Sequence, residues 1–429
     1  MKHYLQHIGS CIYLMAFTAF CAISLGCSSL RDIEFEPSTL PMFLPNSSGN
    51  ILPALLDMQV PQCGLHPDFN PSVLHYTCAT LSDEINITAA ANPGDTLEGY
   101  LNGIAFALIP GVQSDPLQIL NGDNTLTIAV SDGSQIAQYQ IAVYKEHYES
   151  VLIFGTNGSG NGQFLYPRGV AVGPSGNVWV VDSNNHRVQK FLSDSTFAFA
   201  FGSNGSGGGD QMKNPYGIAI SADGAIYITD TNNHRVKKFD QDGNLLAQWG
   251  SSGSGDGRFS FPIGIAVGSN GYVYVADTYN NRIQKFDANG NFIAKWGSPG
   301  GGDTQFNRPF GIAIDANDIL YIADTYNNRI VVYDTNGNFV NTWGSYGTSN
   351  GQFKYPQGIA VSGEHVFVTE YNGYRVQLFS SVGSYITKWG SYGTGPNQFN
   401  KPFGIAVSSG GIVYVVEEQN HRVQAFDIL

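Results

Sequence analysis

The segment Pro167-Arg168-Gly169-Val170-Ala171-Val172 recurs five more times along the chain. The later copies begin at Pro215, Pro262, Pro309, Pro356 and Pro402, at steps of 48, 47, 47, 47 and 46 residues. Each copy is followed by an aromatic strand, then by an Asn-rich turn with an Arg, and then by a strand that in most copies ends in Trp-Gly or Phe-Gly. Four short strands in a unit of this length are typical of a propeller blade.

The number of strands of each kind predicts how the ring closes. The first three strands of the unit occur six times, and so does the fourth, but the first copy of the fourth strand (residues 151–155, VLIFG) precedes every blade. We therefore expect this N-terminal strand to complete the sixth blade and to cover its unpaired edge. The sequence predicts an all-β fold in which residues 148–429 form a six-bladed β-propeller closed by strand exchange.

The repeated pattern, Pro-x-Gly-Ile-Ala-Val followed by Asp-x-x-Asn-x-Arg, is similar to NHL repeats and extends over residues 151–429. This resemblance implies the propeller fold. NHL propellers elsewhere are attached to RING-type ligases, RNA-binding proteins and sensor kinases. None of those functions is expected here, because the chain has no Cys/His zinc cluster, no basic face and no kinase segment.

Charge is low overall and unevenly distributed. Charged residues make up 13% of the chain and the formal net charge is −13. Residues 28–150 hold 2 basic and 14 acidic residues, whereas residues 151–429 hold 18 and 20. Neither part has the basic excess that neutralises phosphates, so nucleic acid is not an expected partner.

The N-terminus has the features of an export signal. A short basic start is followed by an apolar run from Ile8 to Leu25 and then by Gly26 and Cys27. We expect residues 1–26 to be a signal peptide. Gly26-Cys27 resembles a bacterial lipobox, which implies a lipid on Cys27, a tether over residues 27–50 and a location at the bacterial outer membrane or cell envelope. Leu25 and the residue before it depart from the usual lipobox order. Two alternatives for the segment are therefore cleavage by signal peptidase without a lipid and an uncleaved membrane anchor. The alternative location is the periplasm or the medium, as a soluble protein.

Residues 51–147 alternate apolar and polar residues in short runs, which predicts a small all-β domain. Its segments 64–78, 120–133 and 137–145 resemble the bacterial cadherin-like β-sandwich family. The resemblance implies an immunoglobulin-like spacer with Tyr76 and Tyr139 packed inside.

The cysteines are consistent with export. Two lie in the signal segment and Cys27 would carry lipid, which leaves Cys63 and Cys78. We expect a disulfide between them, because an oxidising compartment favours paired thiols, with two buried free thiols as the alternative.

Each blade repeats one acidic and one basic residue five positions apart. A ring of carboxylates could bind a cation or serve acid–base chemistry, but a feature present in every blade is more simply a structural ion pair. The pairs are Asp182–Arg187, Asp230–Arg235, Asp277–Arg282, Asp324–Arg329, Glu370–Arg375 and Glu417–Arg422.

Histidines do not form a pattern of metal ligands. His186, His234 and His421 share a repeat position with two Asn and one Tyr, which favours a role in turn packing. Amidating lyases and gluconolactonase-type enzymes use related propellers with metal cages, but the innermost strands here carry no His, Asp or Glu. No catalytic residue, metal or other cofactor is therefore expected.

Partner binding is expected where the blades differ. Tyr, Phe and Arg gathered around an axial opening suit a protein, peptide or glycan partner. The candidates are Tyr166, Arg168, Tyr216, Tyr279, Arg308, Phe310, Tyr326, Tyr355, Tyr371 and Phe403. The sequence thus favours an envelope-exposed binding or scaffold protein. The alternative for these residues is that their aromatic side chains only cap the channel and pack on one another. The alternatives for the protein are a propeller-type lyase or hydrolase with an unrecognised metal site, and a structural adhesive stalk.

Overall fold

The computed structural model describes residues 53–428 and is all-β. The N-terminal part is a sandwich-like arrangement of a five-stranded sheet, ordered β2-β9-β8-β5-β6, and the strand pairs β1–β4 and β3–β7. Its strands are β1 (Leu55–Gln59), β2 (His75–Thr80), β3 (Glu84–Ile85), β4 (Thr88–Ala91), β5 (Thr96–Leu101), β6 (Ile104–Phe106), β7 (Leu117–Gln118), β8 (Gly122–Ser131) and β9 (Ile136–Lys145).

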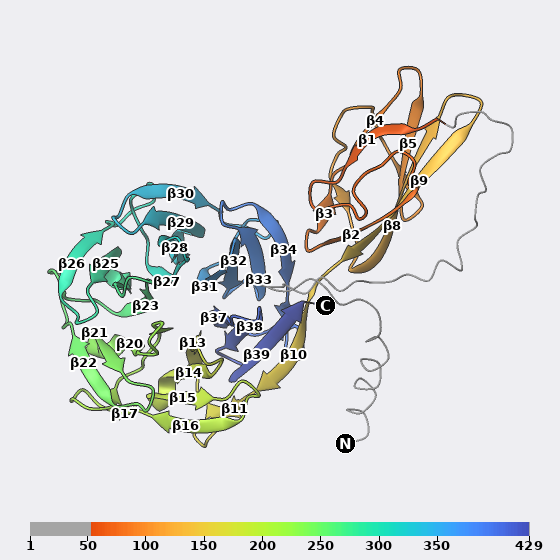
Figure 1. The fold of residues 1–429 in the computed structure, drawn as a ribbon. Helices are drawn as coiled ribbons and strands as arrows, with labels where there is room; N and C mark the ends of the chain where they lie inside the picture. The colour runs from red at the N-terminus through yellow and green to blue at the C-terminus, as the bar shows by residue number, and fades with distance from the viewer. Residues whose placement is uncertain (1–52, 429) are drawn as a thin grey trace, which may run out of the picture. The chain divides into compact units, whose positions relative to one another are not determined.

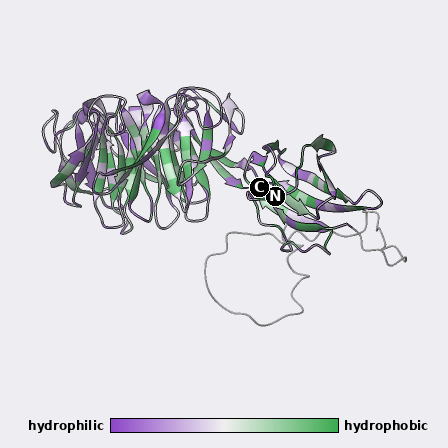
Figure 2. Cartoon of the chain, turned by 90° about the horizontal axis from the view of Figure 1, so that it is seen from above, coloured by the Kyte–Doolittle hydropathy of each residue, from purple (hydrophilic) through white to green (hydrophobic). Residues whose placement is uncertain are grey.

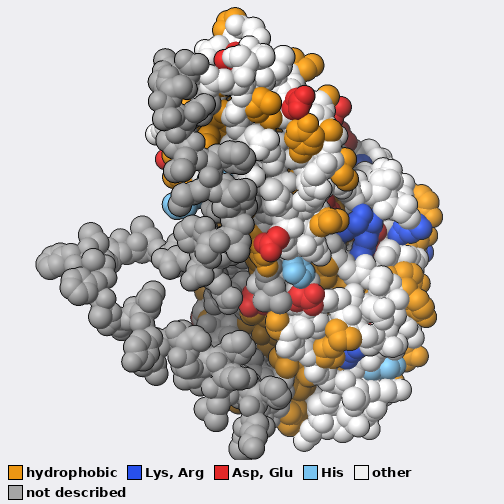
Figure 3. All heavy atoms as spheres, turned by 90° about the vertical axis from the view of Figure 1, so that its right-hand side faces the viewer, with side chains coloured by type: hydrophobic (Ala, Val, Ile, Leu, Met, Phe, Trp, Pro, Cys, Tyr) orange, Lys and Arg blue, Asp and Glu red, His pale blue; other side chains and the backbone are white. Residues whose placement is uncertain are grey.

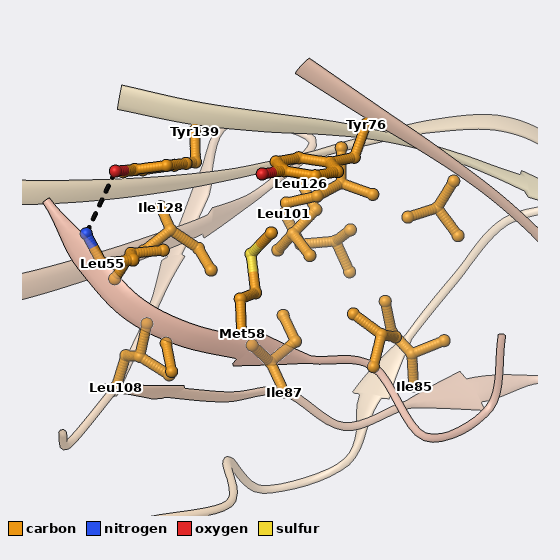
Figure 4. Packing of buried hydrophobic residues seen from close by; sticks show 14 of the residues in the cluster. Leu55, Met58, Tyr76, Ile85, Ile87, Leu101, Leu108, Leu126, Ile128 and Tyr139 are labelled. Atoms are coloured by element: carbon orange, nitrogen blue, oxygen red, sulfur yellow. Dashed lines mark hydrogen bonds between the residues drawn. The ribbon is translucent and has the colours of Figure 1, made fainter. Parts of the chain in front are cut away.

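The alternation seen in the sequence buries one face of each of these strands, and Figure 4 shows the resulting core. Tyr76 and Tyr139 are both buried within it. The Tyr139 hydroxyl accepts a hydrogen bond from the backbone N–H of Leu55 (3.0 Å, dashed in Figure 4). The predicted disulfide between Cys63 and Cys78 is present, with their Cα atoms 5.7 Å apart.

Six four-stranded antiparallel sheets form the propeller. The first three blades contain β13 (Pro167–Val172), β14 (Val178–Asp182), β15 (Arg187–Phe191), β16 (Phe197–Phe201); β19 (Ile218–Ile220), β20 (Ile226–Asp230), β21 (Arg235–Phe239), β22 (Leu245–Trp249); and β23 (Pro262–Val267), β24 (Val273–Asp277), β25 (Arg282–Phe286), β26 (Phe292–Trp296). Figure 1 shows inner strands such as β23 near the centre of the ring and outer strands such as β26 at its rim.

The remaining blades contain β27 (Pro309–Ile314), β28 (Ile319–Asp324), β29 (Arg329–Asp334), β30 (Phe339–Trp343); β31 (Pro356–Ser362), β32 (His365–Glu370), β33 (Arg375–Ser380), β34 (Tyr385–Trp389); and β37 (Pro402–Val407), β38 (Val413–Glu417), β39 (Arg422–Ile428). The sixth blade is completed by β10 (Tyr148–Phe154), which pairs antiparallel with β39. The predicted strand exchange is therefore confirmed, and the ring closes on two strands far apart in the chain.

Short elements connect the blades. Turns of 3-10 helix follow the second strand in four blades, at η2 (Ser183–Asn185), η3 (Thr231–Asn233), η4 (Thr278–Asn280) and η5 (Thr325–Asn327). Short parallel pairs join β11 (Thr156–Asn157) to β12 (Gln163–Phe164), β17 (Ser203–Asn204) to β18 (Gln211–Met212), and β35 (Ser391–Tyr392) to β36 (Gln398–Phe399).

Hydrophobic clusters lie between neighbouring blades. Each cluster takes residues from two consecutive sheets, as where Tyr274 of β24 packs with Leu320 and Ile322 of β28. Hydrophobic residues run through the blade strands, while hydrophilic ones are more frequent toward the loops (Figure 2). The side of the molecule drawn in Figure 3 shows charged side chains singly or in small groups among uncharged atoms.

Glycine allows the inner strands to approach one another around the axis. A Cβ atom built on the Gly of each Pro-x-Gly segment would lie 2.0–2.3 Å from a carbonyl oxygen of the next blade, far inside van der Waals contact. The six residues are Gly169, Gly217, Gly264, Gly311, Gly358 and Gly404. Close approach of backbones, rather than turn geometry, therefore requires glycine at this repeat position.

The predicted signal peptide (residues 1–26) and the predicted tether with Cys27 (residues 27–50) lie outside the described residues. Within residues 53–428, no helix is long and apolar enough to cross a membrane.

Replacing Gly264 by Ala should destabilise the propeller by at least about 2 kcal/mol, because its Cβ would lie 2.0 Å from the carbonyl oxygen of Phe310. Gly255→Ala is the control: the nearest atom, Cδ of Arg258, would be 3.7 Å away, so we expect a change within about 0.5 kcal/mol. Urea unfolding measures both. Equal stability of the two variants would contradict the packing argument.

Candidate functional site

The candidate site is one face of the propeller, at the mouth of the central channel. We define this channel-mouth face by two sets of segments that the sheet register brings to the same end of the blades. Pro167 pairs with Asp182, and the equivalent residues pair in four of the other five blades. The lead-in segments are residues 165–168, 213–216, 260–263, 307–310, 354–357 and 400–403. The second turns are residues 183–186, 231–234, 278–281, 325–328, 371–374 and 418–421.

The residue between Pro and Gly in each lead-in segment lines the channel mouth. The opening encloses about 70 Å³, and its lining includes all six of these residues. They are Arg168, Tyr216, Ile263, Phe310, Gln357 and Phe403. The neighbouring Gly and Pro hold the backbone at every blade, so the side chain at this position is the one that can vary.

An ion pair and an aromatic cluster occupy one side of the mouth. The Arg168 guanidinium donates to a carboxylate oxygen of Glu418 (2.8 Å) and lies 4.1 Å from the ring centroid of Tyr216. Phe403 contacts Tyr216, and also Phe310 and Tyr371. Burial raises the pKa of Tyr216, and burial together with the carboxylate of Glu418 raises the pKa of Tyr371. Both phenols are therefore neutral at physiological pH.

A second group forms an exposed arc. The Arg308 guanidinium lies between the rings of Tyr279 and Tyr326, 4.6 and 4.8 Å from their centroids, and donates to the Tyr326 hydroxyl (3.2 Å). Phe261 packs against Tyr279, and Tyr355 against Tyr326. Tyr279 is 48% exposed, Tyr326 40% and Phe261 38%. This arc presents aromatic surface and a cation to solvent together.

The structure thus places nine of the ten sequence candidates in these two contacting groups. Tyr166 stands apart, with its ring against His421. Glu418 was missed by the sequence reasoning, although the signal was present: its repeat position is Ser or Thr in four blades and differs only at Tyr371 and Glu418. Phe261 and Gln357 also belong to the face, although neither is among the sequence candidates.

The repeated acid–base pairs lie below this face. In each blade the Arg Nε contacts a carboxylate oxygen, for example Arg282 to Asp277 at 2.7 Å, and all six carboxylate side chains have no exposed surface. Asp277 also accepts from the backbone N–H of Ser260 (2.7 Å), and Arg282 donates to carbonyl oxygens of the preceding loop. Burial raises the pKa of Asp277, which the hydrogen bonds and Arg282 oppose. These pairs join the lead-in segment, the second turn and the connecting loop.

The histidines of the second turns accept hydrogen bonds from the next blade. Nδ1 of His186 accepts from the backbone N–H of Asn214 (3.0 Å), as does that of His234 from Phe261 (3.1 Å). His421 and Tyr166 form the same bond across the ring closure (3.2 Å). Asn281 and Asn328 make it with their amide oxygens, at 2.8 and 2.9 Å.

Metal-ligand side chains do not gather at the channel mouth. None of the six lining positions carries His, Cys, Asp or Glu, and Glu418 is paired with Arg168. Across residues 53–428, no group of three or more His, Cys, Asp and Glu residues is arranged to hold a metal ion. The described residues therefore offer no cluster of metal ligands at the channel mouth.

The family follows from comparison with known proteins. The model of the virginiamycin B lyase family matches residues 164–425, which is more than half of the chain. The chain belongs to the virginiamycin B lyase family. The NHL-like propeller inferred from the repeats is consistent with this membership at the level of the fold.

Similar structures cover both parts of the chain. A Bacteroides thetaiotaomicron protein of unknown function is 14% identical, with a TM-score of 0.54 over 89% of this chain and 99% of its own. An auxiliary nutrient binding protein from the same organism is 13% identical, with a TM-score of 0.51 over 88% and 98%. At these identities the likeness shows the fold alone.

A curated relative matches over a short length. Protein brain tumor of Drosophila melanogaster is 46% identical over 52 residues. The match covers 12% of this chain and 5% of that protein.

The interblade histidines predict an acid-sensitive propeller. Burial lowers the pKa of His186, His234 and His421, and a protonated Nδ1 cannot accept a hydrogen bond. The unfolded chain therefore binds these protons more readily than the folded chain, and the free energy of unfolding should fall as pH drops below about 6.5.

Changing all three histidines to Asn should remove much of this loss, because Asn already makes the same bond in two blades. The natural chain should lose more stability between neutral pH and about pH 5 than the variant does, by roughly 1 kcal/mol for each bond lost. Urea unfolding at both pH values measures the difference. Parallel losses in the two proteins would show that other groups cause the acid sensitivity.

Proposed function

We propose that the chain is an envelope-exposed binding or scaffold protein whose channel-mouth face recognises a protein, peptide or glycan partner. The observation that carries this proposal is the arc in which Arg308 lies between two exposed tyrosines. Aromatic rings and Arg beside solvent are the side chains that contribute most to binding energy in many interfaces. A lipid on Cys27 and the tether would hold this face at the envelope, with the sandwich as a spacer.

The arrangement of side chains at the channel mouth also favours partner binding over catalysis. At the mouth the carboxylate of Glu418 is already paired with Arg168, and Tyr216 and Tyr371 have raised pKa values. General acid–base catalysis needs a group that titrates near neutral pH. The two tyrosines do not, and His186, His234 and His421 of the second turns already use Nδ1 to accept a hydrogen bond from the next blade. The auxiliary nutrient binding protein with the same fold is described as a binding protein, which agrees with this proposal without carrying it.

Family membership favours a second candidate, a propeller-type lyase or hydrolase. Stoichiometric calcium or zinc that stays with the pure protein through dialysis would support it. A third candidate is a structural adhesive stalk, in which case deleting the propeller would leave partner binding intact.

Changing Tyr279 and Tyr326 to Ala should reduce capture of a partner by about tenfold or more, because each exposed ring can contribute a large part of the binding energy. The measurement is crosslinking and quantitative pull-down from native envelopes with the full chain as bait. Leu246→Ala with Val340→Ala is the matched control, since both residues are exposed apolar side chains of outer strands.

Equal capture by the tyrosine variant and the control would place the binding site elsewhere. Circular dichroism and thermal unfolding of each variant separate loss of binding from loss of the fold.

A further inference from the structure

The channel-mouth face carries excess positive charge, although the chain has a net charge of −13. Its lead-in segments and second turns contain a single acidic residue, Glu418, which is paired with Arg168. Their other charged residues are all basic: Lys213, Arg308, Lys354 and Lys401. None of these four forms an ion pair with a carboxylate within residues 53–428.

The opposite end of the blades has the reverse character. The turns between first and second strands and between third and fourth strands carry acidic side chains and no Lys or Arg. Those residues are Asp194, Asp223, Asp240, Asp242, Asp287, Asp315, Asp318, Asp334 and Glu364. Lys238 and Lys285 reach carbonyl oxygens of these turns from the third strands. The propeller is therefore polarised, with its positive end at the channel mouth.

The outer connecting loops do not extend the positive area. They carry Asp210, Asp256 and Asp303 beside Arg258, and Asp256 pairs with Lys295 of an outer strand. Unpaired positive charge on this face is thus confined to the segments around the axis, where it overlaps the exposed aromatic arc.

Two buried polar atoms at the mouth also lack partners. Within the described residues, Nε of Arg168 and the amide oxygen of Gln357 are buried and make no hydrogen bond. Gln357 is 6% exposed and, like Arg168, lines the opening. A buried polar group without a partner is costly, so these atoms favour a ligand that supplies both an acceptor and a donor.

We propose that the ligand of this face is an acidic polysaccharide, an inference that rests on the proposed binding function. Its carboxylates would lie against Lys213, Arg308 and Lys354, and its sugar rings against the exposed faces of Tyr279 and Tyr326. Its hydroxyls can both donate and accept, which suits an opening whose lining includes the polar side chains of Arg168 and Gln357. An opening of about 70 Å³ is far below the roughly 300–1,000 Å³ of pockets that enclose a small ligand, so the polymer lies across the mouth rather than within the channel.

An acidic peptide fits the same charge less well. Peptides that are bound without strict sequence often extend a sheet at a free strand edge. Within residues 53–428 this face consists of turns and the segments leading into inner strands, so it offers no such edge. Aromatic faces, amides and hydroxyls are the groups it does offer.

The test measures binding of polygalacturonate, neutral dextran and polyglutamate to the full chain at low and raised salt. Polygalacturonate should bind at least about tenfold more tightly than either other polymer, and added salt should weaken it, since exposed charges are screened. The variant Lys213→Gln/Arg308→Gln/Lys354→Gln should lose about tenfold or more in affinity. The control Lys190→Gln/Lys238→Gln/Lys388→Gln removes three charges elsewhere and should stay within about twofold.

Each other outcome overturns the inference in a distinct way. Equal binding of dextran would remove the role of charge, and tighter binding of polyglutamate would identify an acidic peptide instead. If no polymer binds but envelope capture still depends on Tyr279 and Tyr326, the polysaccharide is wrong and the binding face remains. If capture is also insensitive to those tyrosines, both proposals fail.

Discussion

The close approach of six inner strands around one axis is the constraint on which the rest of the propeller depends. At every blade, a glycine faces a carbonyl oxygen of its neighbour at a distance that leaves no room for a Cβ atom. That oxygen is the backbone carbonyl of the residue between Pro and Gly in the next lead-in segment. For Gly264, for example, it is the carbonyl oxygen of Phe310. The same contact therefore fixes the backbone of this residue and leaves its side chain free at the channel mouth. The glycine that is the same in all six blades and the side chain that differs among them are therefore neighbours in the sequence.

Two further interactions keep the channel-mouth face rigid. The buried carboxylates hold each lead-in segment to its own second turn, and the His or Asn of that turn holds the next blade. The interface between the fifth and sixth blades differs. Tyr374 has no amide or imidazole to accept the hydrogen bond, and the Lys401 ammonium lies over the rings of Tyr371 and Tyr374 instead. A rigid backbone of this kind reduces the ordering cost of binding, because the exposed side chains begin close to fixed positions.

Repetition made most of the fold predictable from the sequence. The blade count and the ring closure by the N-terminal strand both follow from six aligned copies, and alternation indicated that the N-terminal domain is all-β. The binding face was less accessible to this reasoning. Glu418 neutralises Arg168 across 250 residues of sequence, and only the closed ring brings the two together. The position of Arg308 between two tyrosines depends in the same way on a contact between two neighbouring blades, because Tyr279 belongs to the third blade and Tyr326 to the fourth.

The central claim is that the functional surface lies where the blades differ, around the channel mouth. Hydrogen–deuterium exchange of the full chain, with and without a bound uronic-acid polymer, tests it most directly. The account predicts slower exchange in the lead-in segments and second turns around Tyr279, Arg308 and Tyr326, with the acidic turns at the opposite end unchanged. Protection confined to those acidic turns or to the sandwich would contradict it.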